Sequence, residues 1–457
     1  MMYARKERKI PGSVLKPHSP YASLVQSNVL RVQKKTVRVY FPYPQYCFRI
    51  TTQDSFLQIK DRASEIRNAG MQQIKAVHQF KMMDKNMTLG FKVHDSTHIY
   101  NSVVNTMKAA GVRIVPPNSS KWNVLWTGMC KPEQLKDASK YQKINHFPNS
   151  FQIGRKDLMW KNIQRAQKMF QGTGEFNFCP KSYIFPDDYR KFCIERESSN
   201  NKHMYIMKPA ASSCGKGIKV VGPKTQVNKK NGYIVCQYIS NPHLIDGFKY
   251  DLRIYVCVTC FDPLKIFLFR EGLVRFATQK YSNNPKNLDK RFVHLTNYSV
   301  NKKADDYVKS GADDGGEDAS KWNLFQLRNW FNKNGINYNQ ILNRIKDVVI
   351  KTCIAHEPQI TGTYSRCNKN RNVCFEIYGF DILLDSKLRP HLLEINISPS
   401  LSSSSPLDKK IKTTLICDTL NLAGVAPYDR KLYDKEMENV LKKRLLGLDK
   451  NTTQYKM

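Results

Sequence analysis

The stretch that decides the fold runs from Phe375 to Ser400 and reads FEIYGFDILLDSKLRPHLLEINISPS. Two apolar segments with β-strand character flank a short polar turn at residues 385–388, which predicts a β-hairpin. We expect Asp385 to pair with Pro390 across this turn. The apolar residues on both sides are sufficient for the two strands to be buried in a larger sheet.

Three oxygen-bearing side chains interrupt this hairpin: Asp381, Glu394 and Asn396. In the expected register Asp381 lies opposite Glu394, and residues two apart in a strand share a face, so Asn396 joins them. Two carboxylates and an amide on a packed sheet repel unless a cation lies between them. Oxygen donors of this kind suit Mg²⁺. A hairpin with a simply hydrated polar face is the alternative.

The composition indicates a folded protein with a polyanionic partner. The chain has 457 residues, of which 41% are hydrophobic and 11% aromatic. It carries 74 Lys and Arg against 38 Asp and Glu, a formal net charge of +36. Such a field attracts nucleic acid, an anionic membrane or an acidic protein surface, and charge alone does not choose among them. The basic residues are spread along the chain, so we expect the partner surface to lie on the folded body.

The cysteines and the apolar runs indicate a soluble protein in a reducing compartment. The twelve cysteines form no paired framework, and the single CxxC, Cys257 to Cys260, lies in an apolar run typical of buried thiols. The basic start of the chain lacks a signal-peptide core, and no run reaches the length of a membrane span.

Local patterns predict alternating helices and strands. Residues 1–40 read as a flexible basic leader, and residues 98–110 as a helix that ends at Gly111. Strands are expected on both sides of a glycine-rich turn in 204–222, and residues 322–353 are expected to be helical. The polar segment 301–320 is expected to be a loop.

Four further motifs contain side chains suited to anions. The first is a strand that ends at Lys208, followed by a turn at Cys214, Gly215, Lys216 and Gly217. Glycines let backbone N–H groups approach phosphate oxygens, and a lysine adds positive charge. An ordinary hairpin turn explains the same pattern, and no Walker A motif is present.

The second motif is KYDLR, in which alternation places Lys249, Asp251 and Arg253 on one strand face. A buried row of this kind needs ligands or forms a salt-bridge ladder. The third is EGLVRFA, where Arg275 is suited either to clamp a carboxylate or to pair with a surface acid. The fourth is HLTNYS at residues 294–299, whose polar side chains suit ribose or phosphate contacts or an ordinary turn.

The order of these motifs resembles the tubulin tyrosine ligase-like family. Lys208, the GKG turn, KYDLR, EGLVRFA, HLTNYS, GFDILLD and LLEINISPS follow one another as they do in that family. QKINHFPNSFQIGRKDLMW at 142–160 extends the resemblance, which covers residues 142–424. Within the family the chain looks most like the tubulin polyglutamylases, particularly the group numbered four, on the strings HLTNYSVNKK, YGFDILLD and EINISPSLSSSSPLD.

The resemblance implies an α+β fold of the ATP-grasp type, in which two lobes clasp ATP, with an additional N-terminal α/β domain. The expected divisions are a basic, partly flexible region (1–90), the N-terminal α/β domain (91–160), a central ATP-grasp lobe (161–235), a C-terminal ATP-grasp lobe (236–430), and a basic helix and tail (431–457).

It also implies which residues bind the nucleotide and the metal. Two Mg²⁺ ions would be held by Asp381, Glu394 and Asn396. Residues matching the family's contacts to ATP are Lys208, Cys214, Gly215, Lys216, Gly217, Ile218, Cys236, Gln237, Tyr238, Ile239, Lys249, Tyr250, Asp251, Thr296 and Asn297.

The implied reaction joins free L-glutamate to the γ-carboxyl of glutamates in tubulin C-terminal tails through an acylphosphate. Arg275, Lys321 and Lys412 match residues that hold the incoming amino acid, and Arg275, Lys412 and Glu394 are the expected catalytic residues. The implied partners are microtubules and their acidic tails, without nucleic acid or membrane, for a protein expected to be a monomer. The implied location is the cytoplasm and cytoskeleton, with cilium, axoneme and basal body as candidates. A glycine ligase and an inactive microtubule-binding protein are the rival functions.

The chain departs from the family's pattern at several positions. Cys236 stands where the family usually begins its adenine-side hinge with Gln, and Gln237 follows it; either residue is a candidate for the adenine contact. His391 stands in place of a Trp. Ile397, directly after the metal asparagine, resembles the members that start a glutamate branch.

Overall fold

A computed structural model describes residues 89–94, 97, 99–200, 202–212, 215–284, 287–308, 320–425 and 430–448. The expected leader, Cys214 and most of the polar loop at 301–320 lie outside these residues. The elements are a mixture of helices and sheets, so the α+β class is confirmed. No helix among the described residues is long and apolar enough to cross a membrane.

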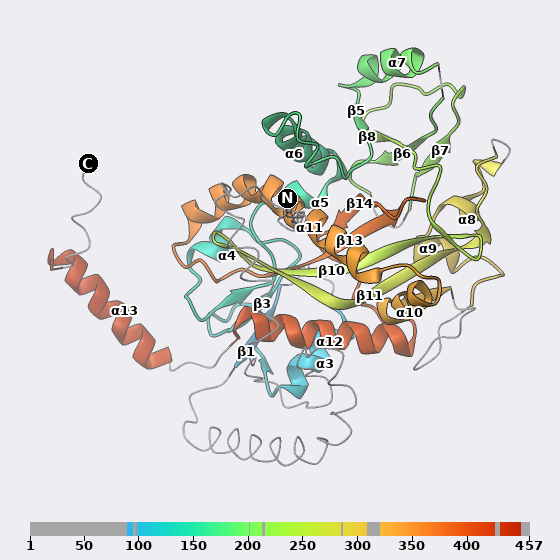
Figure 1. Cartoon of the computed structure of the whole chain (residues 1–457). Coiled ribbons are helices and arrows are strands. Elements are labelled where there is room, and N and C mark those ends of the chain that lie inside the picture. Colours follow the sequence, from blue (N-terminus) through green and yellow to red (C-terminus); the bar gives the residue numbers. More distant parts are fainter. Residues whose placement is uncertain are drawn as a thin grey trace, which may run out of the picture.

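The largest sheet lies at the centre of the molecule (Figure 1) and is antiparallel throughout. Its strand order is β12-β11-β10-β13-β14, with β9 paired to β10. The strands are β9 (Leu244–Ile245), β10 (Phe248–Phe261), β11 (Leu264–Lys280), β12 (Lys321–Asn323), β13 (Glu376–Leu384) and β14 (Pro390–Asn396). All nine residues of β13 are buried, as expected for a central strand whose two faces are both covered.

A second antiparallel sheet, with strand order β5-β8-β6-β7, lies beside the upper edge of the central sheet in Figure 1. Its strands are β5 (Ser182–Phe185), β6 (Tyr205–Pro209), β7 (Lys219–Val221) and β8 (Tyr233–Gln237). The expected strand, glycine-rich turn and strand of 204–222 are β6, the turn and β7. Aromatic side chains of β5 and β6 pack with Phe192 of α7 (Tyr189–Ser198) into a small core of their own.

The third sheet is parallel, with strand order β2-β1-β3-β4. It consists of β1 (Gly90–Val93), β2 (Arg113–Ile114), β3 (Val124–Trp126) and β4 (Lys143–Ile144). The expected helix between its strands is α3 (Asn101–Ala109), after which Gly111 adopts a φ of +73° that favours glycine. This sheet shares its apolar core with β13 and α12 (Pro406–Ala423). An independent N-terminal domain therefore remains a prediction, as do the other domain boundaries.

Five of the remaining helices contact strands of the central sheet: α5 (Phe151–Gly154), α8 (Arg291–His294), α9 (Tyr298–Asn301), α10 (Leu324–Lys333) and α11 (Tyr338–Cys367). Helices α4 (Pro132–Lys136) and α6 (Lys156–Met169) pack on α11, and α13 (Arg430–Leu445) lies apart from the sheets in Figure 1. The prediction of one helical stretch over 322–353 was wrong in its limits. The chain breaks at Gly335, whose φ of +69° does not continue a helix, and α11 then extends to Cys367.

The decisive hairpin forms, but its register differs from our prediction. Leu384, not Asp385, pairs with Pro390, and continuing that register would place Glu394 opposite Phe380 on the wrong face. A β-bulge between the Ile382 and Asp381 pairs absorbs one residue of β14 and restores Asp381 opposite Glu394. The predicted facing pair is thus correct, although the predicted turn was one residue too short.

Candidate active site

A hollow of about 950 Å³, open to solvent, lies between the second sheet and the central sheet. Its walls come from β6 and β8 on one side and from β10, β13 and β14 on the other, with α6 and the segment after α8 completing them. Twelve of the predicted site residues line it: Lys208, Ile218, Cys236, Gln237, Tyr238, Ile239, Lys249, Asp251, Thr296, Asn297, Asp381 and Glu394. The hollow gathers residues more than 180 positions apart in the sequence.

Apolar residues line the hollow together with the predicted adenine hinge. They include Ile206, Ile234 and Leu392, and the hinge residues Cys236 and Gln237 are in the same lining. The Gln237 side chain lies 3.2 Å from His203 Nδ1 through its Nε2 atom. Both hinge residues line the hollow, so both remain candidates for an adenine contact. An apolar pocket with a few polar atoms is the usual environment of a small-molecule ligand.

The glycine turn lies against the HLTNYS segment. Gly215 and Gly217 both have φ values of +70°, which favour glycine, and a Cβ atom on Gly215 would come within 3.2 Å of Asn297 Oδ1. Arg291 Nη2 donates to the Gly215 carbonyl at 3.0 Å. The turn therefore packs closely on the loop that carries Thr296 and Asn297, and its Lys216 side chain is exposed.

Lys249 is the most strongly perturbed cation of the hollow. Its ammonium group donates to Tyr238 Oη and to the His294 carbonyl oxygen, both at 3.0 Å, and it lies 4.6 Å from the centre of the Tyr238 ring. Burial lowers the pKa of Lys249 to about 7, although Asp251 opposes this shift. A cation held at this pKa is suited to an anionic ligand that supplies the missing countercharge.

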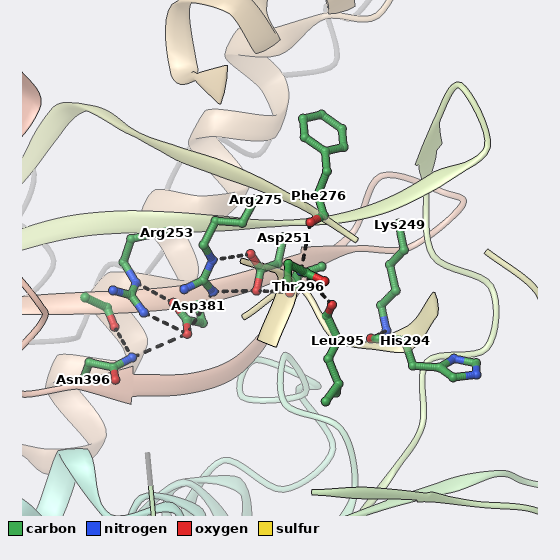
Figure 2. A network of polar contacts seen from close by, with 12 residues as sticks. Lys249, Asp251, Arg253, Arg275, Phe276, His294, Leu295, Thr296, Asp381 and Asn396 are labelled. Atoms are coloured by element: carbon green, nitrogen blue, oxygen red, sulfur yellow. Dashed lines mark hydrogen bonds and ion pairs between the residues drawn. The ribbon is translucent and has the colours of Figure 1, made fainter. Parts of the chain in front are cut away.

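A buried network of two carboxylates and two guanidinium groups lies at the centre of Figure 2. Arg275 donates from Nε and Nη2 to the two oxygens of Asp251, at 2.7 and 2.6 Å, and from Nη2 to Asp381 Oδ2 at 3.0 Å. Arg253 donates from Nε to Asp381 Oδ1 at 2.6 Å, and Thr296 Oγ1 donates to Asp251 at 2.7 Å. The salt-bridge alternative for KYDLR is therefore seen at Asp251 and Arg253. Lys249 and Asp251 also line the hollow, and ligand binding by this row remains a prediction.

The network keeps Asp381 ionised despite its burial. Burial alone would raise the pKa of Asp381, but Arg253 and Arg275 hold it well below its ordinary value. Burial alone would lower the pKa of the Arg275 guanidinium, but Asp251 and Asp381 raise it well above the usual range. The four charges cancel one another, as buried charges must.

The predicted metal ligands approach one another from the two strands of the hairpin. Asn396 Nδ2 donates to Asp381 Oδ2 at 3.4 Å, and Glu394 pairs with Lys156 at 3.1 Å between Nζ and Oε2. Two carboxylates and an amide supply only oxygen donors, which fits Mg²⁺. Within the described residues, no group of three or more His, Cys, Asp or Glu is placed to hold a metal ion, so the amide is needed to complete this set.

Eight of the predicted positions are not among the residues that line the hollow: Gly215, Lys216, Gly217, Tyr250, Arg275, Lys321, Asn396 and Lys412. Tyr250 is 1% exposed and points to the opposite face of β10, where its hydroxyl lies 2.9 Å from His243 Nδ1. This placement follows from strand alternation, because Lys249 and Asp251 on either side of it face the hollow. Lys321 and Lys412 lie outside the hollow's lining but contact the same carboxylate, that of Asp408, at 3.0 and 3.3 Å.

Sequence reasoning did not assign three polar residues of the hollow, Lys156, Ser182 and His294. Lys156 lies in the string GRKDLMW that carried the resemblance, yet nothing in its local pattern distinguishes it from other helix lysines. His294 is 2% exposed and contacts Tyr238 and the Asn287 carbonyl, as a hydrogen-bonded core histidine does, yet it also lines the hollow.

Comparison with known proteins identifies the family. The model of the tubulin-tyrosine ligase family matches residues 134–432. The chain belongs to this family. Ligases of this ATP-grasp-like kind use ATP and Mg²⁺ in general, and their fold agrees with a hollow between two sheets.

Curated relatives carry more specific names. The Homo sapiens protein named tubulin monoglutamylase TTLL4 is 45% identical over 329 residues, which cover 72% of this chain and 27% of that protein. Tubulin polyglutamylase TTLL5 of Homo sapiens is 39% identical over 352 residues, 76% of this chain and 27% of the relative. Tubulin polyglutamylase TTLL6 of Mus musculus is 40% identical over 338 residues, which cover 73% of this chain and 40% of that protein. The chain thus spans about a quarter to two fifths of the length of these relatives.

Proposed function

We propose that this chain is an ATP- and Mg²⁺-dependent ligase that attaches free L-glutamate to glutamate side chains in the acidic C-terminal tails of tubulin. The observation that carries the proposal is the convergence of Lys208, Lys249, Asp381 and Glu394 on one hollow. The names of its relatives and the chain's large positive charge support the choice of glutamate and of an acidic acceptor. The proposed setting is the cytoskeleton, with cilium, axoneme and basal body as candidates.

The proposed reaction has two steps. The acceptor's γ-carboxylate takes the terminal phosphoryl group of ATP and becomes an acylphosphate, and ADP is the leaving group. The α-amine of glutamate then attacks the acyl carbon, a C–N bond forms, phosphate leaves and the amine gives up a proton. Mg²⁺, as two ions held by Asp381, Glu394 and Asn396, would offset the charge of the transferring group.

The chain's own residues would position the reactants. Lys208 and Lys249 present positive charge to the phosphates, where negative charge develops during transfer. Arg275, with Lys321 and Lys412, would orient the carboxylates of glutamate, which converts an encounter into proximity. Ile397, after the metal asparagine, supports an enzyme that starts branches rather than lengthening them.

The first prediction tests this function directly. The protein is incubated with tubulin, ATP, Mg²⁺ and glutamate, and the masses of the tubulin tail peptides are measured by mass spectrometry. We expect single glutamates on unbranched tails, and little incorporation when radiolabelled glycine replaces glutamate. Long chains on pre-branched peptide with no action on unbranched tails would contradict branch initiation.

Glu394→Gln is the matching variant, because it removes a metal-binding charge while keeping the side-chain size. We expect ligation to fall by on the order of 100-fold or more, and microtubule pelleting to persist. Glu438→Gln, on the exposed face of α13, is the control and should ligate normally. Unchanged ligation by Glu394→Gln would remove the metal assignment, and pelleting without ligation by the unaltered protein would favour an inactive binding protein.

A further inference from the structure

Asp408 is a buried carboxylate that two lysines share. It is 1% exposed, and it lies in the first turn of α12, where its backbone N–H donates to the Ser405 side chain. Its Oδ2 accepts from Lys321 Nζ at 3.0 Å, and its Oδ1 lies 3.3 Å from Lys412 Nζ. Ser404 Oγ also donates to Oδ2 at 2.6 Å. Each lysine thus approaches one oxygen of the same group.

The shared carboxylate lies beside the end of the central network. Lys321 pairs with Arg275 in the register of β11 and β12, while Lys412 approaches Asp408 from helix α12. Lys412 also contacts the carbonyl oxygen of Ser402, and Lys321 lies 4.1 Å from the centre of the Tyr298 ring. Two ammonium groups and one carboxylate leave a net charge of +1 at this place.

We propose that Asp408 is a positioning residue that holds Lys321 and Lys412 together as a receptor for an amino acid with a second carboxylate. This inference rests on the proposed function and deepens it. Free glutamate carries a net charge of −1 at neutral pH, whereas glycine carries none. A pair of charged lysines, held at a fixed spacing by a shared carboxylate, therefore favours binding of glutamate over glycine.

The charges around the pair explain why the anion is needed. Lys412 is faced by Asp408 on its own helix, by Lys321 of β12 and by Arg253 of β10. Burial lowers the pKa of Lys412, and Lys321 lowers it further, while Asp408 raises it. Tyr255 and Tyr307 also face Asp408. Without the Asp408 carboxylate, the pKa of Lys412 would be lower, so Lys412 would lose its proton at a lower pH. The two lysines would also lose the group that holds them close to each other.

The test is the dependence of the KM for glutamate on pH in the full chain, with tubulin as acceptor. For Asp408→Asn we expect KM to rise by about 10- to 100-fold, the cost of misplacing a binding group, with a much smaller change in kcat. We also expect the rise of KM at alkaline pH to begin at a lower pH than in the unaltered protein. Asp408→Glu, which keeps a carboxylate, should have a lower KM for glutamate than Asp408→Asn. Its KM should also begin to rise at a pH closer to that of the unaltered protein.

Asp418→Asn is the control, because it makes the same chemical change further along α12 and should leave KM and its pH profile unchanged. Ser404→Ala, at an exposed position, removes the bond from Ser404 Oγ to Asp408 and the 3.1 Å bond that Lys321 Nζ donates to Ser404 Oγ, but it keeps the Asp408 carboxylate. It provides a milder variant if Asp408→Asn does not fold, and it should raise KM in the same direction. An equal or lower KM in whichever of these two variants folds would overturn the proposal. Absence of glutamate ligation in the unaltered protein would instead overturn the proposed function.

Discussion

At the residue scale, the site is built from charges that are satisfied by one another. Arg253, Arg275, Asp251 and Asp381 form a neutral set, and each anion accepts from at least one guanidinium. Lys249 differs from the two arginines, because its described hydrogen-bond partners are a hydroxyl and a carbonyl rather than a carboxylate. Its protonation should therefore respond to the arrival of an anion.

Binding of ATP should accordingly take up a proton near and above neutral pH. The Lys249 ammonium, whose pKa lies at about 7, is mostly neutral at pH 8 and is recharged when phosphates approach. Affinity for ATP should fall as pH rises through 7. Calorimetry at pH 8 in two buffers of different ionisation enthalpy measures the uptake.

Lys249→Arg provides the comparison, because a guanidinium stays charged throughout this range. The variant should show little proton uptake and a flatter dependence of affinity on pH. Equal uptake by both proteins would assign the proton to another group.

At the element scale, the long strands β10 and β11 fix the positions of both arginines. Gly272 of β11 pairs with Ile254, and a Cβ atom there would lie 2.5 Å from the Arg253 carbonyl oxygen and 3.1 Å from Leu324 Cδ1. The close approach of the two backbones at this point requires glycine.

Gly272→Ala should therefore lower the free energy of unfolding by roughly 1–3 kcal/mol and weaken ligation, because it displaces the strand that carries Arg253. Chemical denaturation measures the first effect. Gly362→Ala is the control: it lies in α11 with open space around its Cα, and alanine there should leave stability unchanged or raise it by up to about 1 kcal/mol. Similar stabilities for the two variants would contradict the argument.

The element scale also shows how far the sequence predicted the fold. Strand alternation correctly placed Lys249 and Asp251 on one face of β10, and the final hairpin was correctly predicted to place Asp381 opposite Glu394. That both pairs line one hollow was implied only by the family resemblance. The bulge in β14 was not predictable, because neither Leu392 nor Leu393 carries a signal for the extra residue. The contact of Lys321 and Lys412 with Asp408 is tertiary, and no local period encodes it.

At the scale of the whole molecule, the formal net charge of +36 favours an acidic partner. Attraction between a basic body and an acidic filament is screened by salt, with a Debye length of about 8 Å at physiological ionic strength. The acidic tails would approach the same surface that opens into the hollow.

Co-pelleting with microtubules should therefore weaken steeply as salt rises, and should weaken further when the acidic tubulin tails have been removed by proteolysis. Retention on DNA at matched salt is the control. Stronger retention on DNA than on microtubules would indicate a nucleic-acid binder instead.

Both oxygen atoms of Asp381 already accept hydrogen bonds, so the carboxylate cannot keep all of these bonds and also coordinate a metal ion. It holds Arg253 and Arg275 through both of its oxygen atoms, and these are the atoms that a divalent ion would coordinate. An arriving ion must compete with the guanidinium groups, and any group that it releases becomes available to another anion. The nucleotide and the amino acid would consequently bind as cooperative partners, each altering the affinity of the other by the same factor.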